Sequence, residues 1–166
     1  MPAGSVKADY FLKLTGIQGE SIDSAHKNEI DVLQWGWGAS NSGDAAQRGG
    51  HGVGKVSVQE MHVTMQMNKA SPLIMEKCAT GTHIDEAVLV CRVGGADTPQ
   101  EYLKITLTKV LITRYETGGS DSDVRPLEKF EMAFAKIKME YKPQDDKGKL
   151  GAAVTSTYNV AENQKE

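Results

Sequence analysis

The stretch YLKITLTKVLITR, residues 102–114, decides how the chain folds. Its apolar side chains occupy alternate positions, first in one phase and then in the other: Leu103, Ile105 and Leu107, followed by Val110 and Ile112. Side chains of a strand point to opposite faces in turn, so a change of phase within one strand requires a bulge or bend that keeps the apolar side turned inward. The stretch therefore predicts a long strand that bends near Thr108 and Lys109.

Two more segments show the same change of phase. Residues 56–67 change phase near positions 59–60, and residues 130–141 change phase near positions 135–136. Long strands that bend midway are typical of small β-barrels and of sandwiches whose sheets meet at a corner. We therefore expect a mainly β fold, either a small barrel or a sandwich of two sheets with long bent strands.

The remaining elements follow from shorter patterns. Residues 87–93 are apolar on both faces, as in a strand that is covered on both sides. Ser71 as N-cap, Pro72 at the first helical position and Gly81 as the stop predict one short flanking α-helix at about 71–81.

Three large apolar side chains share one face of the segment near residue 35: Leu33, Trp35 and Trp37. We expect all three to pack into the core. Gln34 and Gly36 then lie on the opposite face of the same strand. Gly36 also has a second explanation, which is that a neighbouring ring or backbone lies too close to leave room for a Cβ atom.

Length and composition exclude several classes of protein. The chain has 166 residues, 39% of them hydrophobic, and we expect one domain over 1–166 with a frayed polar tail at 161–166. Its formal net charge of −3 lacks the basic excess typical of nucleic-acid binding. The longest apolar run, Ala87 to Cys91, has five residues and is too short to cross a membrane. The N-terminal residues lack the apolar core of a secretory signal, which predicts synthesis in the cytoplasm.

No group of residues predicts catalysis. Residues 49–55 resemble a phosphate-binding loop, but Val56 follows where that motif has Ser or Thr, and a strand pattern follows where it has a helix. The four His residues show no metal-ligand spacing, and Cys78 and Cys91 are thirteen positions apart. We therefore predict no catalytic residue, no cofactor and no metal, and two free cysteines.

The order of several segments carries a family resemblance. The segments are EIDVLQWGWG (29–38), a Gly-rich loop, GKVSVQEMHVT (54–64), SPLIMEKCATGTH (71–83), EYLKITLTKVLITRYETGGSD (101–121) and EKFEMAFAKIKMEYKPQ (128–144). Together they resemble the haemolysin-coregulated protein family, Hcp, the tube proteins of bacterial type VI secretion. The resemblance implies a small β-barrel with one helix at its side, assembled into homo-hexameric rings that stack into an expelled tube.

The resemblance also implies partners and sites. The implied partners are stacked Hcp rings, the spike protein VgrG, the contractile sheath and secreted effectors held in the ring lumen, with neither nucleic acid nor membrane insertion. The protein would leave the cell by type VI secretion. In such a ring we expect Gln34 and Gly36 to face the lumen. The loop at 39–53 is the expected ring-stacking element, and its candidate residues are Asn41, Gln47, Arg48 and His51.

Two other functions remain open at this stage. A calycin-like carrier would also be a small barrel, but it would be monomeric or dimeric and would hold a small apolar ligand. A nucleotide-handling enzyme would need the loop at 49–55 to bind phosphate.

Overall fold

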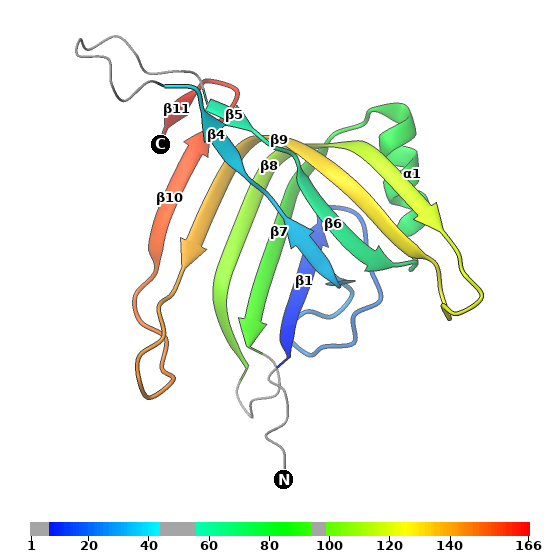
Figure 1. Ribbon diagram of the computed structural model, residues 1–166, viewed down its shortest axis with the longest axis horizontal. Coiled ribbons are helices and arrows are strands. Elements are labelled where there is room, and N and C mark those ends of the chain that lie inside the picture. Colours follow the sequence, from blue (N-terminus) through cyan, green and yellow to red (C-terminus); the bar gives the residue numbers. More distant parts are fainter. Residues whose placement is uncertain (1–6, 44–55, 94–98) are drawn as a thin grey trace.

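The computed structural model describes residues 7–43, 56–93 and 99–166. In chain order the elements are β1 (Ala8–Leu14), β2 (Ile30–Val32), β3 (Gln34–Gly36), β4 (Ala39–Asn41), β5 (Val56–Val58), β6 (Met61–Gln66), α1 (Ser71–Thr80), β7 (Ile84–Val93), β8 (Gln100–Gly118), β9 (Leu127–Tyr141), β10 (Val154–Asn159) and β11 (Gln164–Lys165). Figure 1 shows a strongly curved sheet with α1 at one side. The predicted mainly β fold with two sheets and one short helix is confirmed.

The two longest strands bend where the apolar phase changes. β8 has 19 residues and β9 has 15, and they pair with each other along most of their length. Lys109 adopts a positive φ of 52°, and the ladder between β8 and β9 skips Lys109 and Ala135. The carbonyl of Ala135 instead accepts hydrogen bonds from the backbone N–H groups of Val160 (2.8 Å) and Ala161 (3.1 Å). The bends predicted near 108–109 and 135–136 are therefore confirmed.

These bends divide the sheet into two layers. The broad layer consists of β10, the second half of β9, the first half of β8, β7, β1 and β2. The narrow layer consists of β3, β6, the first half of β9 and the second half of β8. Both layers contribute to one core, in which Leu12, Leu89 and Ile105 of the broad layer join Val63 and Phe130 of the narrow layer.

The two layers also meet at the segment that contains β2 and β3. β2 pairs with β1 and β3 pairs with β6, while Leu33 between them donates its backbone N–H to the carbonyl of Thr64 at 2.9 Å. Each half of the segment therefore has one partner strand, and the two layers form a sandwich rather than a barrel with a continuous ladder. Leu33 is 52% exposed, so its predicted place in the core is wrong. The segment changes partner at this residue, which turns Leu33 outward between the inward-facing Val32 and Trp35.

The helix starts one residue earlier than the sequence predicted. Its N-cap is Ala70, and Ser71 is the first helical residue, so the assignment of Ser71 as N-cap is wrong. The Ser71 hydroxyl is buried, donates to the Glu128 carboxylate and accepts the backbone N–H of Asn68 at 3.0 Å. Pro72 in the first turn and Gly81 as a left-handed C-cap with φ of 66° are confirmed.

The polar C-terminal residues are more ordered than expected. β11 pairs with β10, the Glu166 N–H donates to the carbonyl of Thr157 at 3.1 Å, and the Glu166 carboxylate contacts the Lys136 ammonium at 2.6 Å. The structure thus differs from the expected frayed tail at 161–166, since β11 pairs with β10 and the Glu166 ion pair reaches Lys136 of β9.

Candidate functional site

Two rows of mainly polar side chains cross the outward surface of the narrow layer. Side chains of this layer alternate between the core and the outside, and the outward positions align across β3, β6, β9 and β8. They form two cross-strand rows: Gln34, Thr64, Lys129 and Glu116 in one, and Gly36, His62, Glu131 and Arg114 in the other. We call these eight residues the wall face. The structure thus places the two predicted lumen residues, Gln34 and Gly36, on one surface.

The charges of the wall face balance within the face. Lys129 lies opposite Glu116, and Glu131 lies opposite Arg114. The Arg114 guanidinium also bonds Glu116 on its own strand, with Nε donating to Oε1 at 3.0 Å. This hydrogen bond raises the pKa of Arg114. The four charged residues of the wall face, two positive and two negative, therefore carry no net charge together.

Gly36 lies directly beneath the ring of His62. The two residues are cross-strand partners, and a Cβ atom built on Gly36 would be 2.3 Å from Cε1 of the imidazole. The Cε1–Nε2 edge of the His62 ring therefore fills the space that a side chain at position 36 would take. Gly36 therefore lies on the wall face, and at the same position the nearby His62 ring leaves no room for a Cβ atom.

A two-stranded hairpin extends from the narrow layer. β4 and β5 pair in a separate sheet, with Ala39 opposite Val58 and Asn41 opposite Val56. Asn41 is exposed at the end of β4, and its Oδ1 accepts the backbone N–H of Gly43 at 2.8 Å. The other predicted stacking residues, Gln47, Arg48 and His51, lie outside the described residues, as does the phosphate-loop-like stretch at 49–55.

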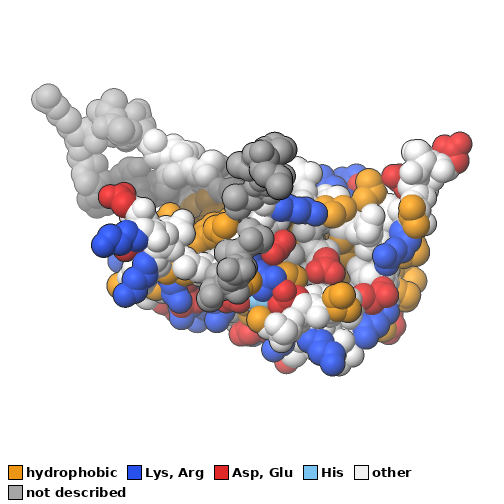
Figure 2. Space-filling view, turned by 90° about the horizontal axis from the view of Figure 1, so that it is seen from below, with side chains coloured by type: hydrophobic (Ala, Val, Ile, Leu, Met, Phe, Trp, Pro, Cys, Tyr) orange, Lys and Arg blue, Asp and Glu red, His pale blue; other side chains and the backbone are white. Residues whose placement is uncertain are grey.

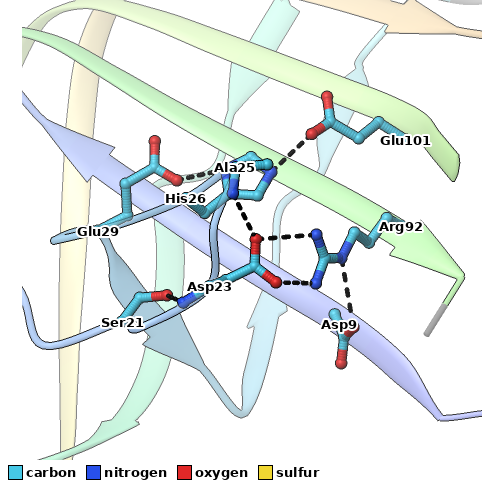
Figure 3. A network of polar contacts seen from close by, with 8 residues as sticks. All are labelled: Asp9, Ser21, Asp23, Ala25, His26, Glu29, Arg92 and Glu101. Atoms are coloured by element: carbon cyan, nitrogen blue, oxygen red, sulfur yellow. Dashed lines mark hydrogen bonds and ion pairs between the residues drawn. The ribbon is translucent and has the colours of Figure 1, made fainter. Parts of the chain in front are cut away.

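A second polar feature lies on the outward surface of the broad layer, where residues 15–29 cover β1 and β7 (Figure 3). Arg92 of β7 is buried there and forms a two-pronged ion pair with Asp23, including a bond from Nη1 to Oδ1 at 3.1 Å. Its Nε also contacts Asp9 of β1 at 3.3 Å. The Arg92 hydrogen bonds lower the pKa of Asp23, and Asp23 in turn raises the pKa of Arg92. This cover confirms that the strand at 87–93 is buried on both faces.

His26 completes this network. Its Nδ1 contacts the Glu29 carboxylate, and its Nε2 lies 2.6 Å from Oε1 of Glu101 on β8. The imidazole stacks on the Phe11 ring with 4.3 Å between centroids, and Arg92 lies 4.7 Å from the same ring. Sequence reasoning did not find this network. The signals were an arginine inside an apolar strand and a His-x-x-Glu spacing, and neither identifies partners that come from distant segments.

The described residues offer little for metal or redox chemistry. Within 7–43, 56–93 and 99–166, no group of three or more His, Cys, Asp or Glu side chains is placed to hold a metal ion. Cys78 and Cys91 are free, and burial raises the pKa of the Cys91 thiol to about 12. No helix in these parts of the chain is long and apolar enough to span a membrane.

Comparison with known proteins gives a consistent result. A family model described as "Type VI secretion system effector, Hcp" matches residues 11–141. Protein hcp1 of Pseudomonas aeruginosa is 40% identical over 156 residues, which cover 93% of this chain and 96% of that protein. The crystal structure of Hcp1 from Salmonella typhimurium is 34% identical, with a TM-score of 0.77 over 96% of this chain and 99% of that one. A type VI secretion system effector from Yersinia pestis is also 34% identical, with a TM-score of 0.72 over 92% of this chain and 100% of that one.

Proposed function

The chain belongs to the Hcp family of type VI secretion proteins, and from this premise we propose that it forms hexameric rings that stack into the expelled tube and carry effectors in their lumen. The family is one of secreted structural proteins, so the chain is not an enzyme. Secretion through the type VI system follows from the same membership. The spike protein VgrG, the contractile sheath and the effectors are the partners that this role requires.

The wall face is the observation that carries the proposal. A lumen that passes different folded cargoes must not bind any of them strongly. The wall face meets this requirement because its charged residues already lie next to partners of opposite sign, as in the Arg114–Glu116 pair. Exposed ion pairs of this kind contribute little binding energy to a passing surface. In the ring, Gln34 and Gly36 face the lumen as part of this surface.

The hairpin of β4 and β5 supports a role in stacking. In Figure 1 it lies at the upper left edge of the molecule, and all three residues of β4 are exposed. An exposed element at an edge can contact a neighbouring ring without disturbing the core. We assign Asn41, Gln47, Arg48 and His51 to this contact.

The described core gives no support to a small-ligand carrier. Large side chains fill the space between the layers, and the largest fully buried ones include Phe130, Met132, Met61 and Leu107. The hollows near the described residues open at the surface instead of lying between the layers.

The mass of the purified protein in solution tests the ring. We expect light scattering at micromolar concentration to give six times 18.0 kDa, and negative-stain images to show rings with a central hole. A monomer or dimer would contradict the proposal. Shortening the loop at 39–53 tests stacking separately, because the variant should keep its hexameric mass and lose secretion.

A further inference from the structure

The connection between β8 and β9 carries an exposed apolar side chain at its tip. Val124 is 97% exposed, the highest value among the large hydrophobic residues of the described chain. The tip is held by hydrogen bonds from the Asp123 N–H to the Ser120 carbonyl (3.1 Å) and from the Met67 N–H to the Pro126 carbonyl (2.9 Å). We call residues 119–126 the tip.

The connection between β9 and β10 forms a well-ordered turn with an apolar hollow. Asp145 Oδ1 accepts the backbone N–H groups of Lys147 (2.9 Å) and Lys149 (2.8 Å), and the Gly151 N–H donates to the Pro143 carbonyl at 2.7 Å. The hollow lies between residues 143–145 and residues 149–152 and has a volume of about 500 Å³. Its lining includes the apolar side chains of Pro143, Leu150 and Ala152. We call residues 142–153 the turn.

The tip and the turn lie at opposite ends of the molecule and carry opposite charge. In Figure 1, the tip (yellow) is at the far right, and the turn (orange) is at the lower left. The tip has two aspartates and one arginine, whereas the turn has three lysines and two aspartates. Figure 2 shows acidic side chains at the upper right-hand extremity, and several Lys and Arg side chains beside an acidic one at the left-hand end. The two ends are therefore complementary in both apolar character and charge.

We propose that the tip of one copy docks into the turn of the next copy within the ring, with Val124 in the hollow formed by Pro143, Leu150 and Ala152. A ring requires a head-to-tail contact between two different patches, and these patches meet that requirement at the two ends of the long axis. Val124 supplies the apolar anchor, and the aspartates of the tip face the lysines of the turn. This inference rests on the proposed ring.

Disulfide trapping tests the contact directly. The variant Val124→Cys with Ala152→Cys should form, on mild oxidation of assembled rings, a covalent ladder that ends at six chains on a non-reducing gel. Each single variant reports the background from Cys78 and Cys91. The pair Val124→Cys with Glu162→Cys is the matched control, because Glu162 is exposed on a different connection. The proposal is overturned if the rings form without a ladder, if the ladder continues beyond six chains, or if the control pair links equally well.

Charge exchange gives an independent test. Asp123→Lys and Lys149→Asp should each raise the protomer concentration for half-assembly by about fivefold or more, since each places like charges across the contact. Combining them should restore assembly to within about twofold of the unmodified protein, because the exchanged charges attract again. Additive losses in the combined variant would overturn the contact. Light scattering of the unmodified protein keeps the two proposals separate, because a monomer there refutes the ring itself.

Discussion

The ion pair between Asp23 and Arg92 allows a quantitative prediction about stability. Removing one partner of a buried ion pair destabilises a protein by about 3–5 kcal/mol, because the remaining charge stays buried without compensation. The side chain of Arg92 is 9% exposed, but that of Asp23 is 23% exposed. Asp9 also remains near Arg92 at 3.3 Å. We therefore expect Asp23→Ala to lower the free energy of unfolding by about 2 kcal/mol, less than for a fully buried pair.

The pH dependence of this effect has a definite sign. Because Arg92 lowers the pKa of Asp23 below its ordinary value of 3.8, the carboxylate contributes stability above that value. The contribution is lost as the pH falls through the lower pKa of the folded state. The difference between the unmodified protein and Asp23→Ala should therefore be constant near neutral pH and shrink toward zero in strong acid.

Urea denaturation at a fixed protomer concentration measures both effects. At neutral pH the midpoint should fall without a change in slope, and the melting temperature should fall by roughly 4–8 °C, at about 2–4 °C per kcal/mol for a chain of this size. Asp85→Ala is the control, since Asp85 is an exposed carboxylate on the same strand as Arg92 and should change stability by less than about 0.5 kcal/mol. A loss below about 0.5 kcal/mol for Asp23→Ala, or a difference that persists in strong acid, would refute the reasoning.

Three further outcomes are expected. Burial and a hydrogen bond to a buried carboxylate raise the pKa of Tyr115 to about 12, so stability should fall as the pH rises from 10 to 12, and Tyr115→Phe should remove that loss in alkaline unfolding curves. Cys91 should react with a thiol reagent at least about 100-fold more slowly than the half-buried Cys78, and equal rates measured by mass spectrometry would show that the core opens. Gly36→Ala should destabilise the protein by less than about 1 kcal/mol, because the His62 ring is the movable end of a side chain, and adding His62→Ala should recover that loss in thermal melts; a larger loss without recovery would mean that backbone, not the ring, limits position 36.

The fold was predictable where a pattern is local and repeated. The phase change near Lys109 appears directly in the sequence because every second side chain of a strand faces the core, and the structure has its bend at that residue. Pro72 and Gly81 marked the helix because their backbone preferences act within a single turn. The family resemblance had the same origin, since it used the order of these same segments.

The errors arose where distant residues decide the outcome. Leu33 follows the alternation of Trp35 and Trp37, but the segment changes partner strand at that residue, and no local pattern indicates this. Ser71 has the composition of an N-cap, yet its hydroxyl bonds Glu128, which is 57 positions away in the sequence. The rest of the wall face could not be predicted for the same reason. Its residues come to lie beside Gln34 and Gly36 only through the pairing of strands that are distant in the sequence.

The bends of β8 and β9 have a mechanical consequence. In an ordinary sandwich the two sheets are separate, and they can slide over each other once the side-chain packing between them yields. Here β8 and β9 run through both layers, so each layer continues into the other along two covalent backbones. A load applied to one layer is transmitted to the other by peptide bonds as well as by packing. A tube driven out by a contracting sheath would thus be built from subunits whose layers resist shear through the chain itself.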